Sequence, residues 1–320
     1  MPPVCRAQRV FLLCAWILST FHATAQVQIQ TSKESALIHI DGELFTEYHV
    51  GDVYRPYFYP VIGPNGKGMT RNFPMKKGVE GEETDHMHHR GVWFGHRAVN
   101  GSNFWGDTPD SGRIVHKGFH RLTFNKKEGS FSTSNDWIAK TGETVCTDER
   151  IVRIYNHPKF RMMDITLTIK ASHGDVVLMD EKDGGMATRL PHTMKVIRRD
   201  KKPVEGHILM SDGSTDAEAW GKRAKWCYSY GPVEGEQAGV AIFDHPGNPN
   251  HPTWWHARTY GLIAANAFGK GHFEKLSDKH AGDVRIASGE SLTFKYRLIW
   301  NEGQLSKEQL DAEFRKFAAN

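Results

Sequence analysis

The sequence has little cysteine and no strong excess of charge of one sign. Its 320 residues include four cysteines, and 41 lysines and arginines against 37 acidic residues give a formal net charge of +4. So few cysteines exclude a disulfide-rich scaffold. A charge this near balance argues against nucleic acid as the main partner, because phosphate binding normally leaves a strongly basic face. The composition predicts a soluble globular protein.

Three motifs that bind common cofactors are absent. The sequence has no Gly-x-x-x-x-Gly-Lys phosphate loop, no Gly-x-Gly-x-x-Gly fingerprint in a βαβ setting and no His-Glu-x-x-His helix. We therefore expect no nucleotide cofactor. We also assign no metal ligands, although the many histidines leave a metal as an alternative that is considered below.

Long apolar runs are also missing, apart from one near the N-terminus. Arg6 and Arg9 precede an apolar run over residues 11–18, and small residues at 23–25 follow it. This order is typical of a secretory signal peptide over residues 1–25, with cleavage before Gln26. The run is too short to span a bilayer stably. We expect a periplasmic or secreted protein, with one domain over residues 26–320 and no membrane contact after cleavage.

Cleavage would leave two cysteines in an oxidising compartment. Cys146 and Cys227 remain, 81 residues apart, and a disulfide between them is permitted there. Two separate buried thiols are equally compatible with the sequence.

Most of the chain alternates between apolar and polar residues, as half-buried strands do. Residues 164–171 alternate cleanly, Asp41-Gly42 between two such runs indicates a hairpin, and residues 239–243 are apolar on both faces. At the C-terminus, Ser306 and Gln309 form a capping-box pattern before an apolar helical stripe. The pattern predicts an all-β fold, a large antiparallel two-sheet β-sandwich with a short C-terminal α-helix near 307–318.

The 18 histidines are not spread evenly, and four of them lie between residues 84 and 96. In an extended run, His86, His88 and Arg90 would share one face. Imidazole and guanidinium groups are costly to bury without partners, so such a face usually lines a polar cleft. We assign His88 and His89 as candidate catalytic residues, and Arg90 and His96 as substrate-binding residues. A surface strand with fortuitous histidines is the alternative.

The residues that follow combine a turn with amide, aromatic and carboxylate groups. Asn103 and Trp105 would bind substrate, and Asp107 is a candidate catalytic carboxylate. Aromatic rings that pack on the C–H faces of a sugar, beside polar groups that bind its hydroxyls, are the usual means of holding carbohydrate. Trp105 is equally compatible with a place in the core.

A second segment repeats the combination of histidine and arginine. Period-2 spacing puts His256, Arg258 and Tyr260 on one face, just after a loop rich in proline, glycine and asparagine. We assign His256 a catalytic role and the other two a substrate-binding role. If this face met the histidines of residues 86–90, the two would form one pocket. The alternative is that Arg258 only pairs with a carboxylate of the sheet.

A fourth segment, residues 180–185, supplies charges at what looks like a hairpin turn. Asp180 is a candidate general base, and Lys182 is a candidate substrate-binding residue on the same face. Solvated charges at a turn are the alternative. Arginines beside the imidazoles are expected to lower the histidine pKa values. A histidine acid would then need a carboxylate neighbour, either Asp180 or Asp107.

Five stretches together resemble the PmoA-labelled family of exported bacterial proteins, over about residues 36–318. They are residues 55–64, the histidine run 85–96 (with Met87 where proline is usual), Phe104-Trp105, Asp180-x-Lys182-x-Gly184 and residues 255–261. The resemblance implies a galactose-mutarotase-type β-sandwich. It further implies a site in which a histidine acid and a carboxylate base flank a sugar ring, with arginine and further histidines on its hydroxyls.

Three functions fit these observations. The first is an exported carbohydrate-active enzyme, a hydrolase, lyase or epimerase that uses histidine and carboxylate acid–base chemistry on a carbohydrate or glycoside. The second is a copper- or zinc-binding protein that uses the histidine cluster. The third is a non-catalytic sugar-binding protein, which has no need of an acid–base pair.

Overall fold

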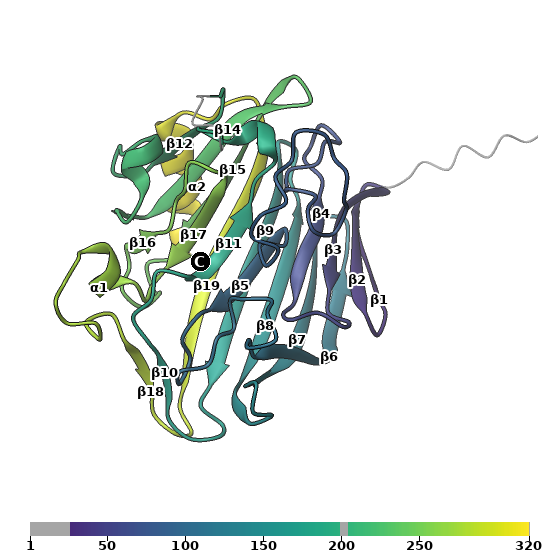
Figure 1. The fold of residues 1–320 in the computed structure, drawn as a ribbon. Helices are drawn as coiled ribbons and strands as arrows, with labels where there is room; N and C mark the ends of the chain where they lie inside the picture. The colour runs from purple at the N-terminus through teal and green to yellow at the C-terminus, as the bar shows by residue number, and fades with distance from the viewer. Residues whose placement is uncertain (1–25, 199–203, 320) are drawn as a thin grey trace, which may run out of the picture.

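The computed structural model describes residues 26–198 and 204–319, so the predicted signal peptide over residues 1–25 lies outside the described residues. Nearly half of the described chain forms β-strands, and most of these pair antiparallel in two large sheets, with one longer helix at the C-terminus (Figure 1). The predicted fold class, an all-β two-sheet sandwich with a short C-terminal helix, is confirmed.

The first large sheet has nine strands. They are β1 (Val27–Thr31), β2 (Ser35–Ile40), β3 (Glu43–His49), β4 (Tyr57–Val61), β5 (Val92–His96), β11 (Gly184–Arg189), β13 (Arg223–Ala224), β16 (Thr253–Trp255) and β17 (Leu262–Asn266). Their order in space is β1-β2-β3-β4-β5-β11-β17-β16-β13. Strands from three distant parts of the sequence therefore lie side by side at β5, β11 and β17.

The second large sheet has eight strands, and a small sheet has two. The eight are β6 (Arg113–Phe124), β7 (Glu128–Ile138), β8 (Thr144–Asn156), β9 (Phe160–Lys170), β12 (His207–Met210), β14 (Trp226–Val233), β15 (Glu236–Asp244) and β19 (Ser291–Glu302). They follow the order β12-β14-β15-β19-β9-β8-β7-β6, while β10 (Val176–Leu178) pairs with β18 (Val284–Ile286). The helices are α1 (Lys270–Phe273), α2 (Lys307–Ala318) and 3-10 turns at His192–Met194 and Asp216–Ala219.

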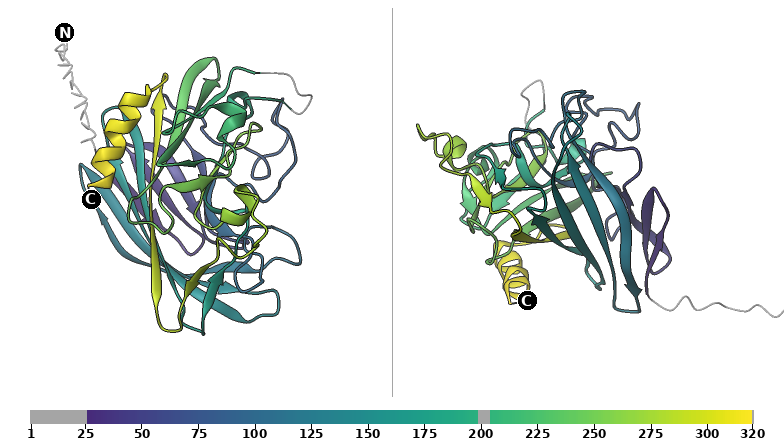
Figure 2. Two further views of the ribbon diagram at one scale, coloured as in Figure 1. Left: turned by 90° about the vertical axis from the view of Figure 1, so that its left-hand side faces the viewer. Right: turned by 90° about the horizontal axis from the view of Figure 1, so that it is seen from below.

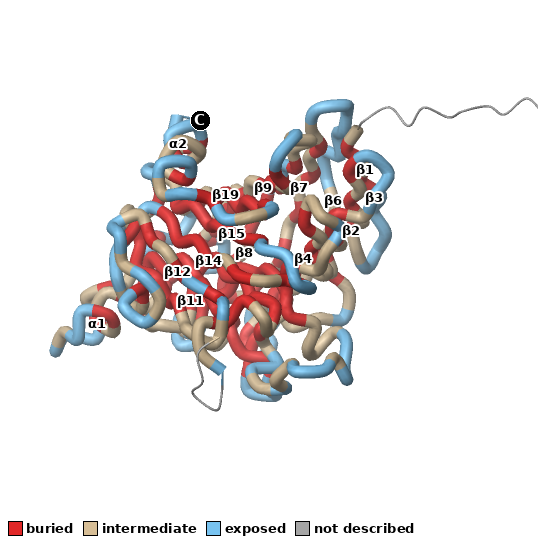
Figure 3. The backbone as a smooth tube through the Cα atoms, turned by 90° about the horizontal axis from the view of Figure 1, so that it is seen from above, coloured by how far each residue is buried: buried red, intermediate tan, exposed pale blue. Residues whose placement is uncertain are grey.

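The two large sheets pack face to face over the main hydrophobic core. Phe94 of β5 contacts Trp137 of β7 and Phe294 of β19 across this interface, with ring centroids 6.4 and 5.8 Å apart. Phe45 of β3 meets Trp300 of β19 in the same way, at 5.6 Å. The buried residues gather between the layers and the exposed residues lie around them (Figure 3).

Local sequence explains several of these elements. Asp41 and Gly42 both have positive φ, 57° and 83°, which a two-residue hairpin of type I′ requires, and they join β2 to β3. In β9 the buried residues alternate, as the apolar–polar pattern predicts. β15 is buried on both faces because one face meets the other sheet and the other face meets α2.

The C-terminal helix begins where its capping residues predict. The Ser306 hydroxyl accepts a hydrogen bond from the backbone N–H of Gln309, and the Gln309 side chain accepts one from the backbone N–H of Ser306. Leu310, Phe314 and Phe317 are buried against strands of the eight-stranded sheet. The helix therefore covers the outer face of that sheet, as the left view of Figure 2 shows.

The two cysteines left open by the sequence are separate buried thiols. Cys146 lies in β8 and Cys227 in β14, and neither is bonded. Three strands, β15, β19 and β9, stand between these two strands. At about 4.8 Å per strand the separation is roughly 19 Å, whereas a disulfide needs Cα atoms within about 7 Å. Burial raises the pKa of both thiols.

None of the helices in residues 26–198 and 204–319 combines the length and the apolar character that crossing a membrane requires.

The outer face of the nine-stranded sheet carries its own aromatic cluster. In β5, Val92 and Phe94 point into the main core, whereas Trp93 points outward. Trp93 packs there with Tyr57, Trp105 and small residues of β11 and β17. Gly95 has no side chain on this face, and a Cβ there would lie 2.7 Å from the carbonyl oxygen of Phe104. The absence of a side chain lets the loop that carries Asn103 and Trp105 pass directly over the sheet.

Candidate functional site

A cavity of about 630 Å³ opens on this outer face. It is lined by His86, His88, His89, Arg97, Asn103, Trp105, Gly106, Thr108, Lys182, Asp183, His256, Arg258 and Tyr260. Eight of the twelve residues assigned from the sequence are in this lining: His88, His89, His256, Asn103, Trp105, Lys182, Arg258 and Tyr260. The segments 86–89 and 256–260 therefore meet at one place, although about 170 residues separate them in the chain.

The histidine segment is a turn and not the extended run that the sequence suggested. His86 has a φ of 44°, and its carbonyl accepts a hydrogen bond from the backbone N–H of His89, at 2.9 Å. The rings of His86 and His89 therefore stack, with centroids 4.8 Å apart. The prediction that His86, His88 and Arg90 share a strand face is wrong, because β5 begins only at Val92.

Gly91 makes the exit from this turn possible. Its φ is 52°, and a Cβ there would lie 1.9 Å from the carbonyl oxygen of Phe58. Only glycine fits both this conformation and this close approach of the neighbouring strand β4. The histidine turn is thus fixed to the sheet at its C-terminal end.

His89 is a neutral imidazole whose tautomer is set by Arg189. An N–H of Arg189 donates to Nδ1 of His89 at 3.3 Å, and Arg189 can only donate. The ring proton of neutral His89 is therefore on Nε2. Burial, followed by the charges of His88 and Arg189, holds the pKa of His89 well below its ordinary value. Nε2–H is the group that His89 can offer to a ligand.

An acidic residue behind the cavity wall keeps Arg189 in place. Asp85 pairs with Arg189 at 3.4 Å and with Arg71 at 2.8 Å, and both arginines are fully buried. Asp85 also contacts Nδ1 of His86 at 2.9 Å. The charges of Arg189 and His86 and a hydrogen bond from His86 outweigh the burial of Asp85, so its pKa is lowered. This network orients two of the cavity histidines.

His256 is held in the opposite tautomer to His89. It follows β16, and its Nδ1 lies 2.9 Å from the backbone carbonyl of Lys182, which can only accept. The proton is therefore on Nδ1, and Nε2 keeps its lone pair with no hydrogen-bond partner among the described residues. Burial lowers the pKa of His256 to about 4, against the opposing effect of Asp183. The lone pair of Nε2 is thus available near neutral pH.

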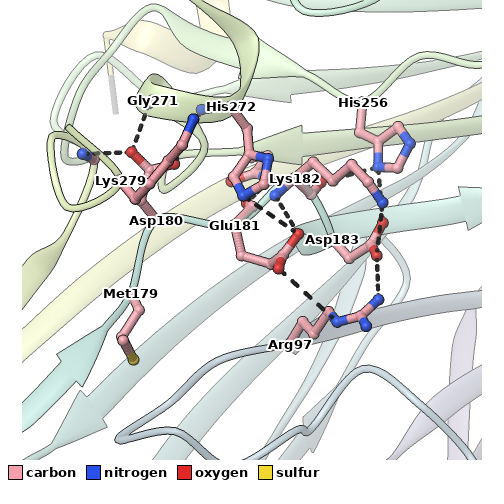
Figure 4. Close-up of polar contacts among 12 residues, drawn as sticks. Arg97, Met179, Asp180, Glu181, Lys182, Asp183, His256, Gly271, His272 and Lys279 are labelled. Atoms are coloured by element: carbon pink, nitrogen blue, oxygen red, sulfur yellow. Dashed lines mark hydrogen bonds and ion pairs between the residues drawn. The ribbon is translucent and has the colours of Figure 1, made fainter. Parts of the chain in front are cut away.

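The carboxylate beside His256 is Asp183, which the sequence analysis did not assign. Asp183 lies 3.4 Å from Nδ1 of His256, 3.1 Å from Arg97 and 3.3 Å from Nζ of Lys182 (Figure 4). Burial alone would raise its pKa, but these three neighbours lower it. The sequence showed Asp183 only as part of an Asp-Gly turn signal. Its position in the charged run 180–183 was the one available clue.

Asp180, the predicted general base, points away from the cavity. Its carboxylate accepts hydrogen bonds from the backbone N–H groups of Gly271 and Gly282, at 2.5 and 2.7 Å (Figure 4). It is buried, and it fixes α1 and the following loop. The segment is not a hairpin either, because it leads from the small sheet into β11. We therefore assign Asp180 a structural role.

Asp107 and Arg90 also lie behind the cavity wall. Asp107 pairs with the buried Arg55 at 2.9 Å and with Arg90 at 2.7 Å. Arg55 in turn donates to the backbone carbonyls of Gly106 and His88, at 3.1 and 2.6 Å. These contacts tie the loop over the sheet to the histidine turn. Both oxygens of Asp107 face cations, so we assign Asp107 and Arg90 to positioning and not to contact with a ligand.

His96 lies inside the sandwich. Strand alternation places residues 92, 94 and 96 on the core side of β5, so His96 contacts Phe268 and places Nε2 2.8 Å from the carbonyl oxygen of Met179. It is fully buried, and burial lowers its pKa to about 4. The assignment of His96 to substrate binding is therefore corrected to a core position.

Aromatic rings form two walls of the cavity. Trp105 is buried on Trp93, with ring centroids 5.2 Å apart, so it serves both the outer cluster and the cavity lining. The Tyr260 ring stacks on the His86 ring, with centroids 5.2 Å apart. The guanidinium carbon of Arg189 lies 4.6 Å from the centroid of the same Tyr260 ring. Residues 256–260 form a loop that ends in a turn from Arg258 to Gly261, not a strand.

The buried neutral histidines predict a loss of stability in mild acid. His96 and His256 both have a pKa of about 4 in the folded protein, below the ordinary 6.5. The unfolded chain therefore binds more protons between these values, and the free energy of unfolding falls as the pH falls from about 6.5 to 4. The difference corresponds to roughly 3 kcal/mol for each histidine. Urea unfolding over this pH range measures it.

A matched pair of variants isolates the contribution of His96. His96→Gln keeps a donor for the Met179 carbonyl but cannot gain a proton, so its free energy of unfolding should depend less on pH. His120→Gln replaces an exposed histidine and should keep the pH dependence of the parent protein. A slope unchanged by His96→Gln would contradict the assignment.

The described histidines do not form a preassembled set of metal ligands. Across residues 26–198 and 204–319, no three His, Cys, Asp or Glu side chains are placed to hold a metal ion together. The cavity histidines are instead stacked on one another and on aromatic rings.

Several solved structures are distantly similar to the chain. An α-galactosidase from Lactobacillus brevis shares 10% identity (TM-score 0.39), over 91% of this chain and 41% of that one. A galactose mutarotase related enzyme from Lactobacillus acidophilus shares 12% identity (TM-score 0.36), over 87% of this chain and 100% of that one. A galactose mutarotase-like protein from Lactobacillus casei ATCC 334 shares 6% identity (TM-score 0.38), over 86% of this chain and 100% of that one. The chain thus spans less than half of the α-galactosidase, and likeness this distant does not bear on activity.

Sequence comparison identifies a family for the chain but no activity. No curated protein matches the chain significantly. The resemblance to PmoA-labelled proteins stays a prediction, because the family profile that matches the chain carries no such label. That profile covers residues 35–315, and the chain therefore belongs to the family of unknown function DUF6807.

Proposed function

We propose that the protein is an exported carbohydrate-active enzyme that moves a proton on a sugar in this cavity. The observation that carries the proposal is the pair of neutral imidazoles in opposite tautomers. Arg189 fixes His89 as a donor through Nε2–H, and the Lys182 carbonyl fixes His256 as an acceptor through Nε2. A binding module has no need of such a pair.

Each histidine has a separate role in the proposed reaction. His256 accepts a proton from the substrate, and its pKa of about 4 keeps it in the base form near neutral pH. His89 donates a hydrogen bond from neutral Nε2–H to the substrate oxygen on which negative charge develops. Asp183, beside His256, stabilises the imidazolium that forms when the proton arrives.

The carboxylate count favours an epimerase or a lyase over a hydrolase. Hydrolysis of a glycoside generally uses two carboxyl groups that flank the scissile bond. Among the described residues that line the cavity, Asp183 is the one carboxylate, and it is paired with Arg97 and Lys182. Removal of a proton from a sugar carbon next to a carbonyl or carboxylate group passes the C–H electron pair to that group as an oxyanion. The step needs a base and a donor to this oxyanion, and His256 with His89 supplies both.

The cavity walls support a sugar as the substrate. The cavity volume of about 630 Å³ falls within the range of about 300–1,000 Å³ that is typical of small-molecule sites. Trp105 and Tyr260 offer aromatic rings for C–H faces, and polar groups surround them. The signal-peptide pattern at residues 1–25 supports export to the periplasm or beyond, where polysaccharide fragments are available.

Hydrogen exchange at carbon tests the proposal. Purified protein is incubated in D₂O with a panel of neutral glycosides, uronides, sulfated sugars and keto-glycosides, and proton NMR follows each C–H signal. We expect loss of one C–H signal, or formation of an unsaturated or epimerised product, with at least one compound. Tight binding without exchange would support a sugar-binding protein instead. No binding and no turnover across the panel would overturn the proposal.

A further inference from the structure

The cavity has more positive charge than its carboxylates balance. Three permanently cationic side chains, Arg97, Lys182 and Arg258, line it together with the single carboxylate of Asp183. Behind the wall, Arg71 and Arg189 face Asp85, and Arg55 and Arg90 face Asp107. At the cavity itself, where Glu181 lies 3.9 Å from Arg97, three cationic side chains stand against two carboxylates.

Arg258 is the cation that no carboxylate balances. In the described part of the chain its guanidinium has no hydrogen bond or ion pair, and it lies 5.2 Å from the ring centroid of Tyr260. The alternative reading of the sequence, in which Arg258 pairs with a carboxylate of the sheet, therefore does not hold. Both Arg258 and Lys182 lie near enough to His256 to lower its pKa. An unpaired guanidinium beside a base is a site for an oxyanion.

Two further polar groups of the cavity are fixed as donors by their neighbours. The side-chain oxygen of Asn103 accepts hydrogen bonds from the backbone N–H groups of Trp105 and Gly106, at 2.9 and 3.0 Å. Its NH₂ group is what remains for a ligand. His89 offers Nε2–H, as its bond from Arg189 requires. A neutral sugar, whose hydroxyls both donate and accept, does not need so many donors.

We propose that the carbohydrate bound in this cavity carries an anionic substituent, a carboxylate or a sulfate group, that binds Arg258 and Lys182. This inference rests on the proposed function and names its substrate class. The anion balances the surplus positive charge of the site. It also adds an opposite charge beside His256, which makes the imidazole a stronger base when substrate is bound.

Matched ligands test the charge directly. Calorimetry near pH 7 compares methyl glucuronide and methyl galacturonide with methyl glucoside and methyl galactoside, and includes a sulfated methyl galactoside. We expect the anionic sugars to bind at least tenfold more tightly than their neutral counterparts. The advantage should shrink when the salt concentration rises from about 20 to 500 mM. Preference for the uronides or for the sulfated sugar identifies the anion.

Variants of Arg258 assign the effect to the proposed site. In Arg258→Gln the ratio of anionic to neutral affinity should fall toward one. In Arg258→Lys, which keeps the charge but loses the bidentate fork, the ratio should be intermediate. Arg153→Gln removes an exposed arginine of β8 and should leave the ratio unchanged. Thermal melts confirm that each variant is folded.

The outcomes separate this inference from the proposed function. Neutral sugars that bind and exchange as well as anionic ones would overturn the anionic substrate and leave the enzyme proposal standing. An anionic preference that persists in Arg258→Gln would also overturn it. Absence of binding and turnover for every sugar would overturn both.

Discussion

Asparagine in place of Asp107 is expected to lower the free energy of unfolding by about 3–5 kcal/mol. The Asp107 side chain is 2% exposed and neutralises Arg55, which is equally buried, at 2.9 Å, as well as Arg90 at 2.7 Å. Asparagine keeps the shape but leaves two cations without a carboxylate, one of them fully buried. Urea unfolding of the parent and the variant at neutral pH measures the difference.

Two further variants show whether the unpaired charge is the cause. Asp110 lies on the same loop but is 82% exposed beside Lys140, so Asp110→Asn should leave the free energy of unfolding nearly unchanged. Adding Arg55→Met to Asp107→Asn removes the buried cation and should recover part of the loss. A loss below about 1 kcal/mol in Asp107→Asn, or no recovery in the double variant, would contradict the argument.

The second large effect concerns catalysis, where His256→Asn is expected to lower kcat/KM by about 10²–10⁴. The asparagine amide can still donate to the Lys182 carbonyl near the position of Nδ1, but no nitrogen replaces Nε2 as a base. The acid limb of the pH profile, expected near the pKa of about 4 in the free enzyme, should disappear with it. The assay is the exchange or turnover of the compound identified by the NMR panel.

Asp183→Asn gives the comparison for this experiment. Asp183 contacts His256 but does not accept the proton itself, so its loss should reduce kcat/KM less than the loss of His256. Both variants must keep the unfolding midpoint of the parent within a few degrees. If His256→Asn keeps more than about one tenth of kcat/KM, His256 is not the base.

Much of the fold could be predicted because its signals are local. The Asp41-Gly42 hairpin, the alternation of β9 and the capping box at Ser306 each depend on residues within a few positions of one another. Backbone conformation at a turn and the first turn of a helix are decided at that range. The fold class followed from the sum of these signals, while the order of the strands did not.

The sequence also predicted part of the candidate site, because its residue types are visible without the fold. Clusters of imidazole and guanidinium groups cannot be buried without partners, so their presence in two segments indicated one polar pocket. The faces assigned within those segments were wrong, because period-2 spacing applies only to strands. His86 has positive φ, and residues 258–261 form a turn. The same alternation, where it does apply in β5, would have placed His96 in the core.

The sequence by itself determined which chemical groups are present and which local elements they form. Only the tertiary structure decided which carboxylate each cation meets. Asp180 and Asp183 are three residues apart and chemically identical, yet the backbone N–H groups of Gly271 and Gly282 bind the first, while His256 and Arg97 approach the second. The thiols of Cys146 and Cys227 stay apart because three strands separate them. Charge pairing and distance depend on contacts between segments far apart in the chain, and local patterns do not contain that information.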